Sequence, residues 1–266
     1  MMPMPPRRRL IWAMSNHCRG PVMKKMLMSM AAIAAGIGSP ALAADISTTA
    51  PPPAPAWSWT GWRLGVEAGG AWGRSQSIYV DPRSPPYIGL PMTNPFAVSG
   101  GLFGGGLGYD WQVDNVIVGA EGDLSAVGKK GASNDIAPFN TTVINTTSEK
   151  WLATGRLRLG MTVAERWLVY ATGGVAAASV GDTIDASADD TGVFTQTKTH
   201  WGWTIGGGLE AALSRNWSIK AEYLYVDLQK GTYFSPDLIV PNAIIGTRAI
   251  HLNNDIVRAG LNYRFD

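Results

Sequence analysis

The sequence comprises 266 residues, which suits one or two domains, and it is rich in glycine (32 residues) and tryptophan (11 residues). Charged side chains make up only 16% of the chain, a composition unlike that of a soluble enzyme with a large mixed core. The formal net charge is +2, but this weak basic balance comes from the N-terminal segment described next. It therefore does not indicate a nucleic-acid partner, and we expect none.

The N-terminal region has the three parts of a secretory signal peptide. Two lysines precede an apolar run over residues 26–38, and a small-residue Ala-Leu-Ala cleavage motif ends at Ala43. The apolar run is too short, and too interrupted by glycine and proline, to span a membrane as a helix. We therefore predict a signal peptide over residues 23–43 that is cleaved between Ala43 and Ala44.

The segments on either side of this signal have no predicted fold of their own. Because Met23 opens a conventional signal by itself, we predict that residues 1–22 are an N-terminal extension from an overlong start assignment. Residues 44–57 contain the run Ala-Pro-Pro-Pro-Ala-Pro-Ala, which predicts an extended proline-rich periplasmic linker. Residues 58–266 then form the predicted membrane domain.

Removal of residues 1–43 changes both the charge and the cysteine content. These residues contain six basic and no acidic side chains, so the mature chain keeps 16 of the 22 basic and all 20 acidic side chains, a net charge of −4. The single cysteine, Cys18, lies in the removed part. The mature chain therefore has no thiol for a disulfide, a nucleophile or lipid attachment.

Eight segments of the mature chain alternate apolar and polar residues with a period of two, which is typical of strands with one apolar face. The last is the clearest, because every second residue from Val257 to Phe265 is apolar and arginine, glycine and asparagine lie between. In an outer-membrane barrel the apolar face contacts lipid and the polar face lines the interior. The predicted strands cover residues 59–73, 101–112, 116–124, 151–161, 167–180, 201–212, 217–227 and 256–265.

Short and long connections alternate strictly between these strands. Turns of about three residues occur near residues 114, 165 and 215, whereas long polar segments cover about residues 74–97, 127–150, 181–199 and 228–250. The resulting repeat of about fifty residues has no solenoid or propeller signature and fits a meander of hairpins. We therefore predict an all-β fold, an eight-stranded antiparallel up-and-down transmembrane barrel with short periplasmic turns and four long outer loops.

Aromatic side chains gather at both ends of the predicted strands. Amphipathic rings favour the headgroup level of a bilayer, whereas a soluble sandwich has no reason to sort tryptophans in this way. We predict one girdle near the short turns, made of Trp62, Trp111, Trp167 and Trp217 with Trp59 and Phe265 beside them. The second girdle, near the long segments, is made of Trp72, Trp151 and Trp201 with Tyr225 beside them.

Several strands resemble the small outer-membrane β-barrel proteins of alphaproteobacteria, called porin-family or outer-membrane immunogenic proteins. The resemblance covers about residues 57–265 and is carried by the segments 59–62 (WTGW), 105–112 (GGLGYDWQ), 170–174 (YATGG) and 217–227 (WSIKAEYLYVD). It implies a monomeric eight-stranded barrel in the outer membrane and little about activity. It also implies that a terminal aromatic residue, here Phe265, is the signal for the assembly machinery, although Asp266 follows it in this chain.

Charged residues on the polar strand faces are the candidate functional residues. One interpretation is a plug of paired charges, because charges in a narrow interior must be compensated and eight strands enclose a space that side chains fill. The alternative is a selectivity ring of a narrow channel. Glu121 and Asp123 share a face like a glycosidase pair, but arginines predicted on the next strand make them salt-bridge partners. The predicted lumen charge network is Glu67, Glu121, Asp123, Arg156, Arg158, Lys220, Glu222 and Arg258.

No pattern in the mature chain predicts a cofactor, metal or catalytic site. The motif Gly206-x-Gly208-x-x-Ala211 matches a dinucleotide fingerprint, but it lies in an alternating strand with no helix after it. His200 and His251 are the only histidines of the mature chain, and two isolated histidines do not make a zinc site. Both are predicted to be solvated residues at the outer strand ends.

The sequence therefore predicts a non-enzymatic, structural outer-membrane protein that contributes to envelope integrity and displays surface loops. The alternatives are a narrow porin-like channel for small solutes and a surface binding module, either an adhesin or a haem-binding protein. The expected partners are outer-membrane lipid and lipopolysaccharide, the assembly machinery at the C-terminal strand, and a host or environmental ligand at the loops.

Overall fold

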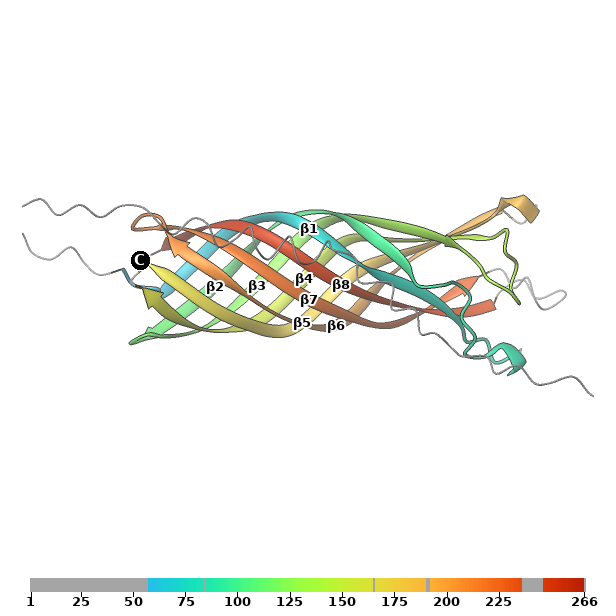
Figure 1. Cartoon of the computed structure of the whole chain (residues 1–266), viewed down its shortest axis with the longest axis horizontal. Coiled ribbons are helices and arrows are strands. Elements are labelled where there is room, and N and C mark those ends of the chain that lie inside the picture. The colour runs from blue at the N-terminus through green and yellow to red at the C-terminus, as the bar shows by residue number, and fades with distance from the viewer. Residues whose placement is uncertain (1–56, 84, 165, 190–191, 236–245, 266) are drawn as a thin grey trace, which may run out of the picture. The chain divides into compact units, whose positions relative to one another are not determined.

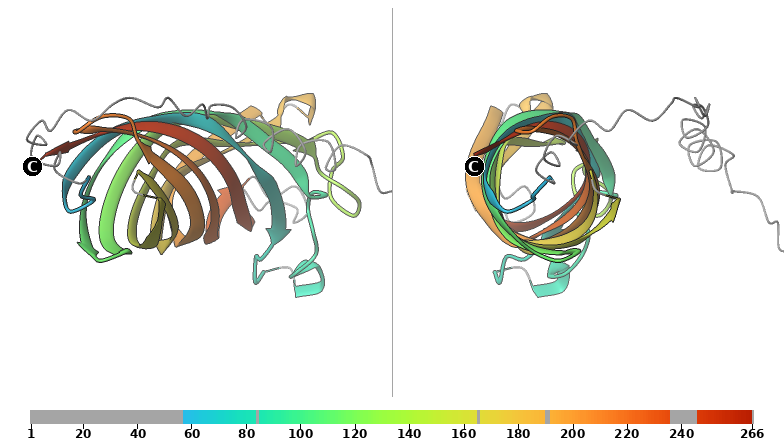
Figure 2. Two further views of the ribbon diagram at one scale, coloured as in Figure 1. Left: turned by 60° about the vertical axis from the view of Figure 1, so that its left-hand side comes forward. Right: turned by 90° about the vertical axis from the view of Figure 1, so that its left-hand side faces the viewer.

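The computed structural model describes residues 57–83, 85–164, 166–189, 192–235 and 246–265, which form a closed antiparallel β-barrel (Figure 1). Each strand pairs with the next along the chain, and the last pairs with the first. The end-on view in Figure 2 shows the resulting ring. The predicted eight-stranded up-and-down barrel is confirmed. Its strands are β1 (Gly61–Tyr79), β2 (Phe96–Val113), β3 (Val116–Asn134), β4 (Ile144–Ala164), β5 (Trp167–Ala186), β6 (Gly192–Ala212), β7 (Trp217–Ser235) and β8 (Gly246–Phe265).

Several predicted features of the chain termini lie outside the described residues. These are the N-terminal extension (residues 1–22), the signal peptide (residues 23–43) with its cleavage site at Ala43 and Ala44, and residues 44–56 of the linker. Asp266 also lies outside them. These features stay predictions.

Side chains alternate strictly between the two faces of the barrel wall. On β3, Val118 and Leu124 point outward and are 55% and 60% exposed, whereas Ile117 and Glu121 point inward and are buried. Successive Cβ atoms of a strand point to opposite faces, so the sequence alternation becomes an apolar outer wall and a polar interior. A continuous exposed apolar wall of this size is what a lipid-facing barrel requires.

The short turns and both ends of the barrel domain lie at one end of the barrel, which we call the short-turn end. Gly61 pairs with Asp110, and Trp62 pairs with Phe265. The turn between β2 and β3 consists of two residues, and Asp114 adopts a left-handed conformation with φ of 53°. Aspartate tolerates this conformation better than most residues. The opposite end carries the longer connections, and we call it the long-connection end.

The strands extend much further toward the long-connection end than the sequence pattern predicts. The predicted polar segment 127–150 contains the end of β3 and the start of β4, and only residues 135–143 connect them. The predicted segment 181–199 shrinks in the same way to a connection over residues 187–191. These extensions lack an apolar outer face, because strand pairing beyond a bilayer needs only backbone hydrogen bonds. Strands of 18 to 21 residues exceed the ~9–11 that cross a bilayer.

The interior is packed in alternating polar and apolar layers, which can be followed along β8. From the short-turn end toward the long-connection end, its inward residues are first polar and then apolar at Ile256. They are polar at Asn254, apolar at Leu252 and Ile250, and charged again at Arg248. The apolar layer includes Leu102, Leu152, Ala176, Leu224, Val226, Leu252 and Ile256, which form one buried cluster. Apolar side chains therefore alternate with polar side chains along the barrel axis.

Packed aromatic side chains lie at the long-connection end, beside the connections before β2 and after β3. Tyr79 at the end of β1 is buried against Met92 and Phe139, with its ring centroid 5.6 Å from that of Phe139. The connection before β2 folds back on β1, because the Met92 N–H donates to the carbonyl of Ser77 at 2.8 Å. The described helices are 3-10 turns at Pro85–Tyr87 and Ser187–Asp189. Across the described ranges, no helix is long and apolar enough to cross a membrane.

Candidate functional site: the charged interior

The short-turn half of the interior contains a compact charge network, which we call the lower network. The structure places all eight candidate lumen charges inside the barrel, and all are buried. Four further buried charges join them. The six cations of the lower network are Arg63, Arg156, Arg158, Lys220, Arg258 and Arg264, and the six carboxylates are Glu67, Asp110, Glu121, Asp123, Glu210 and Glu222. Six positive and six negative charges leave the lower network without net charge.

Arg156 and Arg258 connect strands on opposite sides of the ring. Arg156 on β4 lies 2.9 Å from Asp123 and 3.0 Å from Glu222, and it also pairs with Glu121. Arg258 on β8 lies 3.1 Å from Asp123 and 2.7 Å from Glu222, and it also pairs with Glu67. Two guanidinium groups therefore share two carboxylates across the barrel. Such multiply paired charges offset the cost of burial that each would carry alone.

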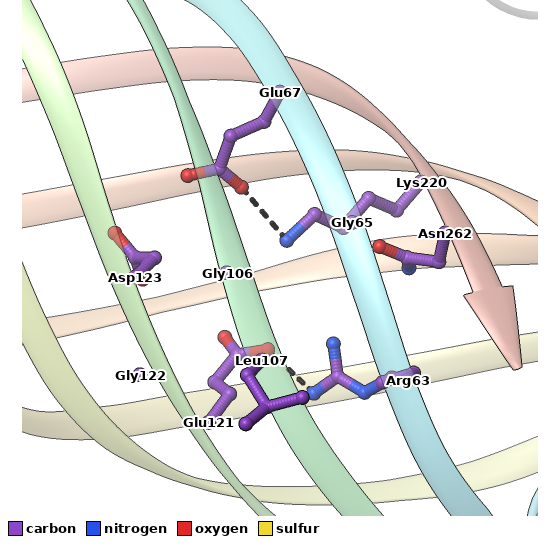
Figure 3. A pocket seen from close by; sticks show the side chains of 10 residues that line it. All are labelled: Arg63, Gly65, Glu67, Gly106, Leu107, Glu121, Gly122, Asp123, Lys220 and Asn262. Carbon is purple, nitrogen blue, oxygen red and sulfur yellow. Dashed lines mark hydrogen bonds and ion pairs between the residues drawn. The ribbon is translucent and has the colours of Figure 1, made fainter. Parts of the chain in front are cut away.

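Further contacts of the lower network join strands that are one or two positions apart in the ring (Figure 3). Lys220 lies 2.9 Å from Glu67, and Arg63 lies 3.0 Å from Asp110 and 2.5 Å from Glu121. The cavity between these side chains has a volume of about 10 Å³, which suits about one water molecule. This cavity therefore has no space for a solute larger than water.

A second group of buried polar side chains lies nearer the long-connection end. Lys129 on β3 lies 3.0 Å from Glu149 on β4, and Asn254 on β8 donates to the same carboxylate at 2.9 Å. Above this triad, Arg248 on β8 donates to Asp182 on β5 at 2.9 Å through its Nε. On β8, Ile256 of the apolar cluster lies between both groups and Arg258 of the lower network.

Sequence reasoning missed part of this arrangement for two different reasons. Four of the missed charges lie at inward positions of the strand alternation, so the pattern that identified the other charges identifies them too. They are Arg63, Asp110, Glu210 and Arg264. The other missed charges lie in segments that were predicted as loops. They are Lys129, Glu149, Asp182 and Arg248. No apolar outer face marks those segments as strands, and nothing in the sequence pattern placed them in the interior.

The predicted girdle tryptophans lie on the outer wall. Trp62, Trp72, Trp111, Trp167, Trp201 and Trp217 are exposed, and Trp151 is half-buried. Their exposure is what an aromatic girdle requires. Trp59, by contrast, was wrongly placed beside the girdle. It is fully buried inside the short-turn end against Ile117 and Leu168, and the guanidinium of Arg264 lies 5.4 Å from its ring.

One of the two histidines differs from the prediction of solvated rim residues. His200 points into the barrel and is 3% exposed, and its Nε2 lies 2.8 Å from the hydroxyl of Tyr233. It lies just beyond the point where the pairing of β6 with β7 ends, at Gly202 and Leu228. His251 is half-buried on the outer wall, with its Nε2 3.3 Å from Asp227. Within the described ranges, no group of three His, Cys, Asp or Glu side chains could hold a metal ion.

Asp135, in the connection after β3, is predicted to make this region sensitive to pH. Burial raises the pKa of its carboxyl from 3.8 to about 6, although Arg248 and a hydrogen bond from Asn145 oppose the rise. Because the folded state binds the proton more tightly, the resulting stabilisation is complete below pH 3.8 and is lost as the pH rises through 6. Amide exchange over residues 135–143 should therefore be slower at pH 5 than at pH 7.5.

Between pH 7.5 and pH 5 the expected change in the local opening free energy is about 1.4 kcal/mol, because pH 5 lies about one unit below the folded-state pKa. Asp135→Asn should remove this pH dependence, because the amide keeps the hydrogen-bonding shape without a titrating group. Equal pH dependence in Asp135→Asn and the parent protein, after correction for intrinsic exchange, would contradict the assignment.

Comparison with known proteins agrees with this architecture. Residues 31–265 match the family model described as "Outer membrane protein beta-barrel domain". The 31 kDa outer-membrane immunogenic protein of Brucella melitensis biotype 1 is 35% identical over 258 residues, which cover 91% of this chain and 100% of that protein. The 25 kDa outer-membrane immunogenic protein of Brucella abortus biovar 1 is 24% identical over 91% of this chain and 98% of that protein.

A solved structure shows the same fold at low sequence similarity. The outer membrane protein OprG from Pseudomonas aeruginosa superposes with a TM-score of 0.51 at 13% identity, over 77% of this chain and 97% of that chain. The family model, the curated relatives and the exposed apolar wall agree on the location. The protein is therefore an outer-membrane protein, and it belongs to the family of outer-membrane β-barrel proteins related to the Brucella outer-membrane immunogenic proteins.

Proposed function

We propose that the protein is a closed structural barrel that contributes to envelope integrity and displays its long connections at the cell surface. The lower network is the observation that supports this proposal most strongly. Its twelve charges compensate one another across the interior, and an apolar layer follows along the axis. A passing solute would have to break several buried ion pairs and then cross apolar side chains, both of which are costly.

The proposal assigns no catalytic role to the buried acids. Glu121 and Asp123, the pair that resembles a glycosidase arrangement, are engaged by arginines and by the hydroxyl of Thr154, which donates to Asp123 at 2.6 Å. A general acid needs a proton and a reachable substrate. Multiply paired carboxylates in a filled interior have neither.

Surface display is supported by the extension of the wall beyond the outer tryptophans. On β6 the outward residues change at Trp201 from apolar to threonine, at Thr199, Thr197 and Thr195. Polar outward residues suit contact with water instead of lipid. Two relatives carry the word immunogenic in their names, which agrees with exposure of this part of the barrel.

Planar-bilayer recording tests the closed barrel directly. The refolded mature protein is expected to give no discrete conductance steps, because the lower network and the apolar layer block the axis. Steady steps of one size would contradict the proposal and favour the narrow channel. If such steps occurred, Lys220→Glu should change their ion selectivity, whereas Lys230→Glu on the exposed wall of β7 should not.

We further propose that Phe265 is the assembly signal. Phe265 is 45% exposed, pairs with Trp62, and contacts the ring of Tyr263 at 5.1 Å. Phe265→Ala should reduce the yield of heat-modifiable barrel in cells, while deletion of Asp266 should leave it unchanged or improve it. Phe103→Ala, at an outward aromatic residue far from the C-terminus, is the matched control. Equal yields from Phe265→Ala and the parent protein would refute the assignment.

A further inference from the structure

The backbone ladder between β6 and β7 ends well before either strand does. Their pairing ends at Gly202 and Leu228. Beyond this point β6 stays paired with β5, and β7 stays paired with β8. Residues 193–201 of β6 and 229–235 of β7 therefore face each other without a backbone ladder, and we call this gap the seam.

A bulge on β7 and the ring of His200 mark the start of the seam. The pairing of β7 with β8 shifts its register between Leu228 and Gly231, and such a bulge bends the strand that carries it. The His200 ring fills the space beside Gly231, because a Cβ at Gly231 would overlap its Nε2. The bend and the ring together hold the two strands apart.

Side chains of β6 take the place of a neighbouring strand along the edge of β7. The Phe234 N–H donates to Oε1 of Gln196 at 3.2 Å. Two residues away on β7, the Thr232 carbonyl accepts a hydrogen bond from Nζ of Lys198. An adjacent backbone would supply the same acceptor and the same donor. Gln196 and Lys198 therefore occupy the place of a missing strand.

The edge of β6 points a row of backbone groups into the seam. At the other end of β6, the Ala212 N–H donates to the Arg166 carbonyl on the β5 side, and the next N–H, that of Leu213, donates toward β7. Alternate residues of an antiparallel strand bond to opposite neighbours, and the pairing with β5 has no register shift. The odd-numbered residues of β6 therefore face the seam. In the part of the chain that the structure describes, no hydrogen-bond partner meets the backbone groups of Val193, Thr195, Thr197 and Thr199.

We propose that the seam binds an extended acidic peptide segment of a surface partner, which inserts as an additional strand between β6 and β7. An exposed, unpaired strand edge is a template for such pairing, and main-chain hydrogen bonds supply the affinity in this mode of recognition. The inserted backbone pairs with the free edge of β6 and replaces Gln196 and Lys198 on β7. The inference rests on the proposed display of the long-connection end at the cell surface and is independent of the closed interior.

The charges beside the seam favour an acidic segment over a second copy of the protein. Lys198 and Lys230 lie at the seam, and neither has an ion pair with any residue whose position the structure gives. An antiparallel pairing of two β6 edges centred near Thr197 would bring two Lys198 side chains together, and like charges destabilise a sheet. Carboxylates of an inserted strand pair with these lysines instead. They belong at this end of the seam, because Asp185 of β5 pairs with Val193 at the other end.

Fluorescence anisotropy of labelled peptides on the refolded mature barrel tests the insertion. The probe alternates threonine with glutamate and is about seven residues long, the length of the free β6 edge. Its matched control carries lysine in place of glutamate. The glutamate peptide should bind more tightly, by roughly fivefold for each cation that it faces.

Modified peptides test whether backbone hydrogen bonds carry the binding. N-methylation of alternate central residues removes N–H groups along one edge of the peptide and should abolish binding. N-methylation at the two ends alone should leave the binding in place.

Variants of β6 separate its edge from its side chains. Thr195→Pro with Thr197→Pro removes two N–H groups that face the seam and should abolish binding, whereas the edge tolerates proline. Thr195→Val with Thr197→Val keeps both N–H groups and should bind like the parent. Gln196→Ala frees the Phe234 N–H and should tighten binding about fivefold, the contribution of one hydrogen bond. Heat-modifiable migration shows that each variant has folded.

The proposal is overturned by the absence of saturable binding of the glutamate peptide, or by equal binding of that peptide to the proline and valine variants. Equal affinity for the glutamate and lysine peptides, or for the centrally N-methylated and unmodified peptides, overturns it too. Dimerisation of the barrel that the proline variant abolishes would assign the edge to a second copy instead. These results leave the closed interior, which bilayer recording tests, and surface display, which labelling of intact cells tests, unaffected.

Discussion

Arg258→Met is expected to lower the free energy of unfolding by about 3–5 kcal/mol, the cost of leaving buried charges without their partner. Arg258 is buried on β8 and pairs with Glu67 on β1, Asp123 on β3 and Glu222 on β7. Its removal changes the net charge of the lower network from zero to −1 and leaves Asp123 with a single cation. The measurement is the denaturant midpoint of the refolded barrel, followed by heat-modifiable migration.

Lys230→Met is the matched control, because it removes an exposed cation from the wall of β7. Surface charges of this kind contribute about 0–1 kcal/mol. The double variant Arg258→Met, Asp123→Asn should lose less stability than the sum of the single variants, since it removes a charge with its partner. If Arg258→Met cost no more than Lys230→Met, the lower network would be solvated, and the channel interpretation would gain support over the closed barrel.

Gly174→Val is expected to prevent barrel closure, while Gly173→Val is expected to be tolerated. Gly174 points into the barrel, and a Cβ there would lie 2.1 Å from the carbonyl oxygen of Gly155 and 2.7 Å from Cα of Arg156. Both atoms belong to the backbone of β4 and cannot move without breaking the pairing of β4 with β5. Gly173 points outward, where the nearest atom to a Cβ is the carbonyl oxygen of Thr204 at 3.6 Å.

The two variants add the same side chain at adjacent positions of one strand. The strand propensity of valine therefore does not contribute to the difference between their refolding yields. Valine favours strands, and Gly173→Val should refold with a yield close to that of the parent protein. Gly174→Val should give unfolded migration on unheated gels. Similar yields from both variants would show that β5 shifts its register easily, in conflict with the unbroken pairing of β5 with β6 from Trp167 to Ala186.

The lipid-facing half of each strand could be predicted from the sequence because the bilayer demands an apolar outer face. Because of this requirement, apolar residues occupy every second position, for example Val257 and Leu261, and the structure confirms the strand there. Beyond Trp72, Trp151 and Trp201 the requirement for an apolar outer face no longer applies. The strands continue without an apolar outer face, and backbone pairing, which leaves no residue pattern, defines them.

The charged interior shows the same division. Alternation placed Glu121, Arg156 and Arg258 on inward faces, but it did not identify their partners, because pairs such as Arg258 with Glu67 join residues 191 positions apart. Trp59 was placed beside the girdle because it lies at the start of the first predicted strand. In the structure it enters the barrel mouth instead, where Arg264 faces its ring.

The sequence by itself determined the strand number, the inward and outward faces and the family, because each follows from local alternation or from matched residues. Only the tertiary structure decided which charges compensate one another, how far the strands continue beyond their apolar outer faces, and which side chains fill the interior. The physical reason is that alternation repeats every second residue and is visible locally. Charge compensation depends on ring closure, which brings β1, β3, β4, β7 and β8 around one shared set of carboxylates.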